Sequence, residues 1–435
     1  MMPHKNEAAM DGLGVVVMAA GRGTRMRSEQ AKVLHRIVGR PMIHYALDLA
    51  CAVAGHSVAV VVGHQAAQVR AALESALAGQ AGHVAVHIVE QVQQLGTGHA
   101  VLQTRPVFAD GNRKAPAAYL ILNGDTPLLQ ESTVRELLRM HRTSGATVTM
   151  LTAILENPGG YGRVVRRPVR GASGAVHASA DVLKIVEDRD ASPEERAIRE
   201  INVGTYVVDG AFLFAALDKV QPHNAQGEYY LTDIVDMAVT QGHRVAALPL
   251  TNPDEGLGVN TRVQLAEAEQ VIRRQIRRRW MEAGVTMVDP ASTWIEADVV
   301  IGKDTVLHPN VTLEGKTAIG EGCEVRSFTR LTNCVVGAHV HILDPFDLAS
   351  HAGLEERYQA PSDGWEQLTP DERKALGVLD LSWPLTQADV KSRYKELVKL
   401  HHPDANGGAR EAEEKLKQIN AAYSTLRSSE RLPVA

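Results

Sequence analysis

Residues 13–26 read LGVVVMAAGRGTRM, and this stretch decides the fold of the first half of the chain. Its first six residues, Leu13 to Met18, form an apolar run that predicts a buried strand. The loop after them, Ala19-Ala20-Gly21-Arg22-Gly23-Thr24-Arg25-Met26, brings backbone N–H groups and small residues to the end of that strand. A polyanion can approach such a loop closely. An ordinary glycine-rich strand-to-helix turn is the alternative, so the loop alone predicts only phosphate binding.

Short β-branched runs alternate with helical patterns over the first ~250 residues. We expect strands at 56–62, 83–90, 119–122, 145–155 and 201–208, and a helix at 42–54. This alternation is typical of an α/β domain in which crossover helices cover both faces of a parallel sheet. The sequence therefore predicts a Rossmann-like nucleotidyltransferase domain over residues 1–253.

Asp125 stands at the end of one of these strands, in Leu122-Asn123-Gly124-Asp125. In parallel sheets, ligands bind in the crevice at the carboxyl ends of the strands. Mg²⁺ that bridges phosphates takes one or two carboxylate or amide oxygens from the protein. Asp125 is thus a candidate Mg²⁺ ligand, with Asn260 as its distant partner, although a strand-end aspartate can also be a plain helix cap.

The middle of the chain contains a different architecture. Residues 262–283 predict one long helix, which we assign to a connector at 254–290, and its basic face favours solvent exposure over nucleic-acid binding. Apolar residues then recur at about six-residue spacing from Trp294 to Ile342, with turns such as Ile301-Gly302-Lys303-Asp304. This pattern predicts about three coils of a left-handed hexapeptide-repeat parallel β-helix at 291–342.

The C-terminal part predicts an all-α domain. A polar linker is expected at 343–372, followed by a helical domain at 373–430. Thr386 and Asp389 form a capping pair before a helix with Val390 and Tyr394 on its apolar face. The tripeptide His402-Pro403-Asp404 follows that helix, and a second amphipathic helix comes after it.

Composition excludes several classes of protein. Apolar residues make up 44% and charged residues 22% of the chain, and the net charge is −5. We therefore expect neither nucleic-acid nor membrane binding. Three scattered cysteines suit a reduced, cytoplasmic protein rather than a disulfide or zinc framework.

Residues 13 to about 342 resemble the bacterial bifunctional N-acetylglucosamine-1-phosphate uridyltransferase/glucosamine-1-phosphate acetyltransferase family. The resemblance rests on motifs that occur in order after the phosphate loop. They are Lys32-Val33-Leu34-His35, Gln94-Leu95-Gly96-Thr97-Gly98-His99-Ala100, Asn123-Gly124-Asp125, Gly160-Tyr161-Gly162-Arg163, Ile185-Val186-Glu187, Glu200-Ile201-Asn202-Val203-Gly204 and Asn224-Ala225-Gln226-Gly227-Glu228-Tyr229-Tyr230-Leu231-Thr232-Asp233.

This resemblance implies that the chain converts UTP and N-acetylglucosamine 1-phosphate into UDP-N-acetylglucosamine and pyrophosphate with Mg²⁺. Met18, Ala19, Ala20 and Gly21 would contact the uridine and its phosphates, with further substrate contacts from Asn123, Gly124 and Asp125. Arg25 and Lys32 would neutralise the triphosphate. The uracil ring would be read by Gln91, Gly96 and Thr97, the sugar by Gly162, Glu187 and Asn202. Asp125 and Asn260 would hold the metal.

The family's acetyl-transfer site lies on later coils of its β-helix, so we expect acetyl transfer to be absent and a homotrimer to be doubtful. The C-terminal domain resembles a DnaJ-type J-domain. This implies Hsp70 as a partner, contacted through His402-Pro403-Asp404 and a positive face of Lys391, Arg393, Lys395 and Lys399. A chance HPD loop is the alternative. For the chain as a whole, the alternative to an enzyme is a co-chaperone whose N-terminal domain is only a tether.

Overall fold

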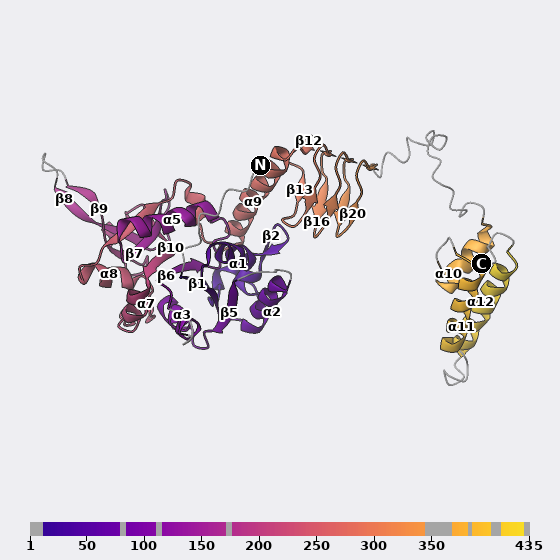
Figure 1. The fold of residues 1–435 in the computed structure, drawn as a ribbon, viewed down its shortest axis with the longest axis horizontal. Coiled ribbons are helices and arrows are strands. Elements are labelled where there is room, and N and C mark those ends of the chain that lie inside the picture. Colours follow the sequence, from indigo (N-terminus) through magenta and orange to yellow (C-terminus); the bar gives the residue numbers. More distant parts are fainter. Residues whose placement is uncertain are drawn as a thin grey trace. The chain divides into compact units, whose positions relative to one another are not determined.

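The computed structural model describes residues 12–78, 84–109, 115–170, 176–343, 368–381, 385–401 and 410–429. The chain divides into two compact units, Met1–Asp344 and Pro345–Ala435. Figure 1 shows an α/β domain that runs through one long helix into a stack of short strands, and a separate helical unit. None of the described helices is long and apolar enough to cross a membrane.

The α/β domain is built on one large sheet with the strand order β11-β7-β10-β6-β1-β4-β5. The strands are β1 (Leu13–Ala19), β4 (Ser57–Val62), β5 (Ala85–Glu90), β6 (Ala118–Asn123), β7 (Val148–Ile154), β10 (Glu200–Asp209) and β11 (Val245–Pro249). All the strands predicted from the apolar runs are present. β1 pairs in parallel with both β4 and β6, so its phosphate loop leaves the middle of the sheet.

The prediction of a parallel sheet is wrong for one part of the domain. β10 runs antiparallel to its neighbours β6 and β7. A hairpin of β8 (Arg163–Arg170) and β9 (Val176–Val186), which the sequence reading missed, extends the sheet from β10. Apolar content does not encode strand direction, so this reversal could not be read from the pattern.

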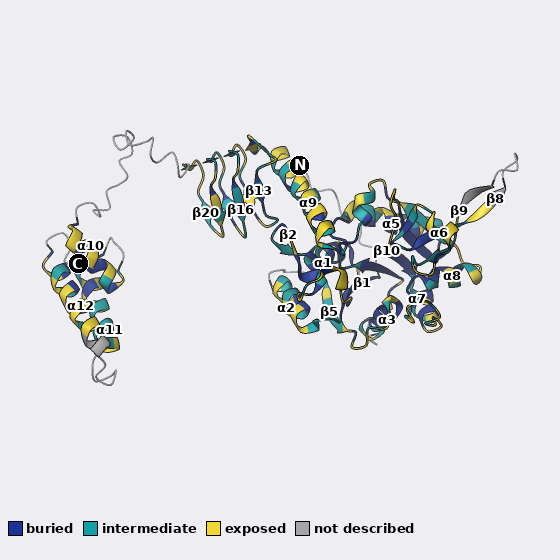
Figure 2. Ribbon diagram, turned by 180° about the vertical axis from the view of Figure 1, so that it is seen from behind, coloured by how far each residue is buried: buried dark blue, intermediate teal, exposed yellow. Residues whose placement is uncertain are grey.

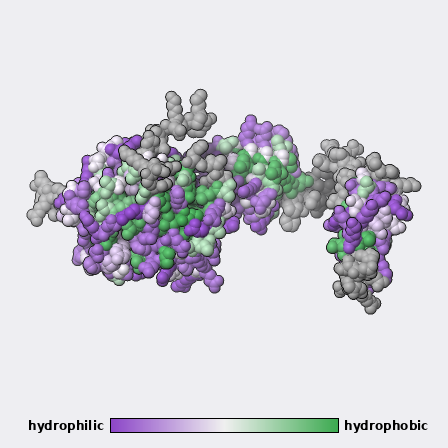
Figure 3. Space-filling model, turned by 60° about the horizontal axis from the view of Figure 1, so that its bottom comes forward, coloured by the Kyte–Doolittle hydropathy of each residue, from purple (hydrophilic) through white to green (hydrophobic). Residues whose placement is uncertain are grey.

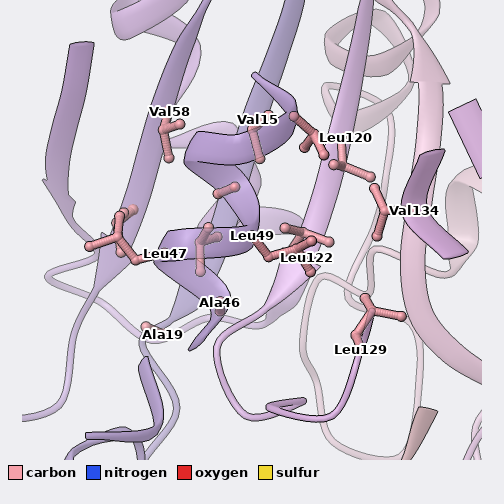
Figure 4. Close-up of a cluster of buried hydrophobic side chains, with 14 of the residues drawn as sticks. Val15, Ala19, Ala46, Leu47, Leu49, Val58, Leu120, Leu122, Leu129 and Val134 are labelled. Atoms are coloured by element: carbon pink, nitrogen blue, oxygen red, sulfur yellow. The ribbon is translucent and has the colours of Figure 1, made fainter. Parts of the chain in front are cut away.

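Helices cover both faces of the sheet, as predicted. On one face α1 (Met42–Val53), α2 (Ala66–Leu77) and α5 (Glu131–Ser144) pack against β1, β4 and β6 through residues such as Leu47, Leu122 and Val134. Figure 4 shows these side chains pointing into one cluster. On the other face lie α3 (Thr97–Leu102), α7 (Gly210–Leu217) and α8 (Asp233–Thr240). Figure 2 shows the sheet between them as the buried centre of the domain.

The remaining short elements connect these layers. They are η1 (Thr24–Met26), η2 (Lys32–Leu34), β2 (Arg36–Ile37), β3 (Arg40–Pro41), α4 (Arg105–Phe108), α6 (Pro193–Arg196) and η3 (Pro253–Gly256). The long helix α9 (Arg262–Glu282) follows η3, and Thr261 with Gln264 forms a capping box at its start. Because both partners of that box satisfy otherwise unpaired backbone N–H groups, the start of α9 is fixed.

A short parallel β-helix follows α9. Its strands stack in three columns, β12-β15-β18-β21, β13-β16-β19 and β14-β17-β20. Their bounds are β12 (Thr286–Met287), β13 (Trp294–Ile295), β14 (Val300–Ile301), β15 (Val306–Leu307), β16 (Thr312–Glu314), β17 (Ala318–Ile319), β18 (Glu324–Val325), β19 (Arg330–Thr332), β20 (Val335–Val336) and β21 (His341–Ile342). β12 lies before residue 291, so the coils begin earlier than the repeat pattern indicated.

Apolar side chains fill the inside of the coils and also lie outside. Leu307, Leu313 and Val325 are fully buried and join a cluster that includes Ile272 of α9 and Ile37 of the α/β domain. Val335 is 84% exposed, and Figure 3 shows apolar surface on this lobe. The shared cluster makes the β-helix and the α/β domain parts of one unit.

The second unit contains α10 (Pro370–Leu379), α11 (Gln387–His401) and α12 (Arg410–Arg427). Leu376, Val390, Ile419 and Leu426 form its core, and Thr386 and Asp389 cap α11 as expected. α10 begins within the range 343–372 that we assigned to a linker, because Thr369 and Glu372 form a capping box that the pattern reading overlooked. His402-Pro403-Asp404 lies outside the described residues.

Candidate active site

Two adjoining pockets open at the carboxyl ends of β1 and β6. The larger has a volume of about 520 Å³ and the smaller about 310 Å³. Met18, Thr97, Asn123 and Asp125 line both pockets, so the two form one continuous site. This is the edge where the sequence reading expected a ligand.

The phosphate loop and the segment at residues 91–97 line the larger pocket. Gly96 has φ 113°, and a Cβ there would lie 2.6 Å from the carbonyl oxygen of Tyr229. Only glycine fits this backbone, which lets the main chain approach a ligand closely. The Gln91 side-chain amide donates to the carbonyl of Gly96 at 3.0 Å, and Leu231 N–H donates to the Thr97 hydroxyl at 3.0 Å.

Lys32 lies where the two pockets meet. Its ammonium contacts the Asp125 carboxylate and donates to Asn260 Oδ1 at 3.1 Å. The Lys32 and Asp125 side chains are 12% and 20% exposed. The Val259 N–H donates to the carbonyl of Asp125 at 2.8 Å, so the backbone also joins the two segments. A carboxylate and an amide oxygen thus converge on one positive charge.

Hard oxygen atoms are the ligands that Mg²⁺ prefers, and Asp125 and Asn260 supply such a pair. No group of three or more His, Cys, Asp or Glu side chains among the described residues could hold a metal ion. A metal that is bound partly by substrate phosphates does not need such a group. The residues present therefore fit a divalent cation that arrives with a nucleotide.

The smaller pocket is lined by residues of β10, of the turn before β8 and by Glu187, which directly follows β9. Asn202 N–H donates to the carbonyl of Gly162 at 2.9 Å, and the Thr232 hydroxyl donates to Glu187 Oε1 at 3.3 Å. Burial is the main cause that raises the pKa of Glu187 above the ordinary value of a carboxyl. These groups offer hydrogen bonds of both kinds to a hydroxylated ligand.

Most residues predicted from the sequence lie in one of the two pockets. The larger holds Ala19, Ala20, Gly21, Lys32, Gln91 and Gly96, and the smaller holds Arg25, Gly162, Glu187, Asn202 and Asn260. Gly124 lines neither; a Cβ there would lie 2.8 Å from Ile43, so packing explains this glycine. Arg25, which we expected to neutralise the triphosphate, lines the smaller pocket and not the larger one.

Several side chains that line the pockets were not among the predicted site residues, for example those of Tyr206 and Thr232. Tyr206 lines the smaller pocket, and its hydroxyl is buried. Arg22 lines the larger pocket and donates to Gln94 at 3.0 Å. Thr232 contacts Glu187. Arg22 and Thr232 belong to motifs that were recognised, whereas Tyr206 is hidden in the apolar run of β10.

On α11 the predicted positive face is smaller than expected. Arg393 pairs with Asp380 at 3.0 Å and with Glu396 at 3.1 Å. Lys391, Lys395 and Lys399 are exposed and lie at four-residue spacing, so they share one side of the helix. The expected face therefore consists of three lysines.

Family models match three successive parts of the chain. A MobA-like NTP transferase domain matches residues 15–191, a bacterial transferase hexapeptide with six repeats matches 298–333, and a DnaJ domain matches 374–432. A structure of UDP-glucose pyrophosphorylase complexed with UDP-glucose has a TM-score of 0.46 and 19% identity. It aligns over 60% of this chain and 98% of that one.

Curated relatives match the first unit. The bifunctional protein GlmU of Pelobacter propionicus is 44% identical over 77% of this chain and 68% of that protein. GlmU of Heliobacterium modesticaldum is 44% identical over 78% of this chain and 69% of that protein. The chain therefore belongs to the GlmU family, as a nucleotidyltransferase of the sugar-phosphate uridylyltransferase kind that carries a DnaJ domain.

Proposed function

We propose that this protein makes UDP-N-acetylglucosamine and pyrophosphate from UTP and N-acetylglucosamine 1-phosphate. One observation supports this above the others: Lys32, Asp125 and Asn260 converge where a larger and a smaller polar pocket meet. The larger pocket suits a nucleoside triphosphate, the smaller a sugar phosphate, and the junction suits the reacting phosphates.

A phosphate oxygen of the sugar phosphate attacks the α-phosphorus of UTP in line. The bond from that phosphorus to the bridging oxygen breaks, and pyrophosphate leaves. Such a transfer depends on positioning and charge stabilisation rather than on a protein nucleophile. Lys32 would neutralise the charge that develops on the phosphates, and the phosphate loop would supply N–H donors. We assign no general base, because the attacking phosphate is already an anion.

Mg²⁺ would be held by Asp125 and Asn260, and it would add positive charge at the transferred phosphate. The Asn260 side-chain amide donates to the carbonyl of Gly258 at 3.2 Å, which turns Oδ1 toward Lys32 and Asp125. The Lys32 ammonium contacts both the Asp125 and the Asn260 side chains. We propose that it shifts toward the phosphates when the metal–nucleotide complex enters.

Substrate choice is proposed to follow from the two pockets. Gln91, Gly96 and Thr97 would read the edge of uracil, because a hydrogen-bonding site rejects bases that leave its groups unpaired. Gly162, Glu187 and Asn202 would hold the acetamido sugar. The buried Glu187 carboxylate suits a sugar hydroxyl or amide N–H as donor.

A second function is proposed for the C-terminal unit. The DnaJ match and the three exposed lysines of α11 favour docking on an acidic surface of an Hsp70. His402-Pro403-Asp404 would stimulate ATP hydrolysis there. Acetyl transfer is not part of the proposal, because the hexapeptide match ends at residue 333 and the DnaJ match begins at 374.

Two variants separate the functions. Asp125→Asn should abolish UDP-N-acetylglucosamine formation, measured by mass spectrometry, and leave stimulation of an Hsp70 ATPase intact. His402→Gln should have the opposite effects. Synthesis that persists in Asp125→Asn would contradict the proposed site, and ATPase stimulation that persists in His402→Gln would contradict the proposed co-chaperone role.

A further inference from the structure

One buried histidine next to the site has no part in the chemistry described above. His35 ends the short turn η2 that begins with Lys32, and it is 4% exposed. Its Nδ1 lies 3.2 Å from Nη1 of Arg262, the first residue of α9. Its Nε2 is buried and has no partner among the described residues.

Packing alone does not explain this histidine. An imidazole with an unpartnered buried nitrogen is less favourable in a core than an aliphatic side chain of similar size. A guanidinium can only donate, so Nδ1 must accept and the ring must be neutral. Burial first, and the Arg262 charge second, lower the pKa of His35, which keeps the ring neutral at neutral pH.

The two partners flank the residues that converge in the site. Lys32 is three residues before His35, and Asn260 is two residues before Arg262. Lys32 meets Asn260 across 228 residues of sequence, and His35 meets Arg262 across 227. The same two segments are therefore joined twice, by Lys32 and Asn260 in the site and by His35 and Arg262 outside the two pockets.

Further hydrogen bonds hold the conformation of each of the two segments. His35 N–H donates to the carbonyl of Lys32 at 3.2 Å, and Met42 N–H donates to the carbonyl of His35 at 2.9 Å. The Gln264 side chain accepts from the N–H of Asn260 at 2.8 Å. The two segments also pack together through Ile37 and Ile272. Close to the site, the Arg262–His35 hydrogen bond links them through their side chains.

We propose that His35 and Arg262 are positioning residues, whose hydrogen bond sets the distance between Lys32 and Asn260 in the nucleotide site. This inference rests on the proposed function, because the distance between Lys32 and Asn260 affects catalysis only if both residues act on the nucleotide. Neither residue lines either pocket. Their effect should therefore appear in the rate of transfer and in the binding of the metal–nucleotide complex, with little change in sugar-phosphate binding.

The test is a double-variant cycle. His35→Leu and Arg262→Met should each lower kcat about tenfold, because small misplacements of reacting groups cost one to two orders of magnitude. The double variant should lose no more than either single one, since both remove the same bond. His35→Asn, which keeps an acceptor near the Nδ1 position, should restore kcat to within about threefold. Arg278→Met is the matched control: Arg278 lies on the same helix, pairs with Glu282 and is 78% exposed.

Two further measurements give a readout besides turnover. Calorimetry should show weaker binding of UTP with Mg²⁺ by His35→Leu and unchanged binding of UTP with EDTA. Thermal unfolding of His35→Leu should show no loss of stability, whereas a purely structural role of His35 would produce such a loss. Multiplicative losses in the double variant, or a wild-type kcat in Arg262→Met, would overturn the proposal. If the wild type transfers no uridylyl group, the proposed function fails, and the Mg²⁺-dependent binding of UTP still decides the positioning role.

Discussion

Replacing Lys32 with methionine tests the junction of the two pockets, because it removes the charge and keeps most of the side chain. The ammonium contacts Asp125 and Asn260 in a setting where the charged pair is only 12% and 20% exposed. Loss of one contact that stabilises developing charge raises a barrier by about 2–4 kcal/mol. We therefore expect kcat to fall roughly 30- to 1000-fold, since about 1.4 kcal/mol is tenfold.

The same substitution should also lower stability. Removing one partner of a fully buried ion pair costs about 3–5 kcal/mol. Partial exposure allows water to reach Asp125, which reduces the expected loss to about 2 kcal/mol. Adding Mg²⁺ should recover part of this loss, because Asp125 and Asn260 then share the metal instead of the ammonium.

Steady-state pyrophosphate release and urea unfolding, each with Mg²⁺ or EDTA, measure these effects. Lys303→Met is the matched control, since the Lys303 side chain is 67% exposed and its ammonium lies 4.0 Å from the carboxylate of Glu321. A Lys32→Met variant that keeps more than about a third of kcat would contradict this role of Lys32. A loss of stability that is the same in Mg²⁺ and in EDTA would contradict binding of the metal by Asp125 and Asn260.

Three further predictions concern other parts of the chain. Glu187→Gln should raise KM for N-acetylglucosamine 1-phosphate about 10- to 100-fold, because hydrogen bonds to charged groups contribute about 1.5–3 kcal/mol. The KM for UTP should not change. Equal changes in both KM values would contradict a role of Glu187 in sugar binding. Burial and the neighbouring carboxylates raise the pKa of Asp233 from 3.8 to about 6, so its stabilising contribution is present below pH 3.8 and lost as pH rises through 6. Asp233→Asn should accordingly increase the free energy of unfolding by about 1–2 kcal/mol above pH 7 and hardly at all near pH 4, with urea titrations at both pH values as the check. Ile419→Ala should destabilise the C-terminal unit by about 3 kcal/mol, because Ile419 is fully buried, and calorimetry should show this without any change in uridylyl transfer.

The elements with strong local signals could be predicted from the sequence. The apolar run of β1, the glycine-rich loop and the six-residue repeats each encode their structure within a short window. The reversed direction of β10 and its hairpin partners β8 and β9 could not be predicted. Strand direction depends on which neighbours a strand finds in the folded sheet, and no short window contains that information.

The residues of the candidate site likewise divide into those that could be predicted from the sequence and those that could not. Gln91, Glu187 and Asn202 could be named because the resemblance to a known family implies their roles. Tyr206 was missed because it belongs to the apolar run of β10 and packs in the core while it also lines the pocket. The pairing of His35 with Arg262 was missed because the two residues are 227 positions apart.

Pyrophosphate release from UTP, measured with three sugar phosphates, tests the central claim most directly. With Mg²⁺ present, N-acetylglucosamine 1-phosphate should give pyrophosphate and an equal amount of UDP-N-acetylglucosamine. Glucose 1-phosphate and galactose 1-phosphate should react at least about tenfold more slowly, since they leave the groups that read the acetamido moiety unpaired. Release that needs no Mg²⁺, or that is as fast with glucose 1-phosphate, would contradict the account.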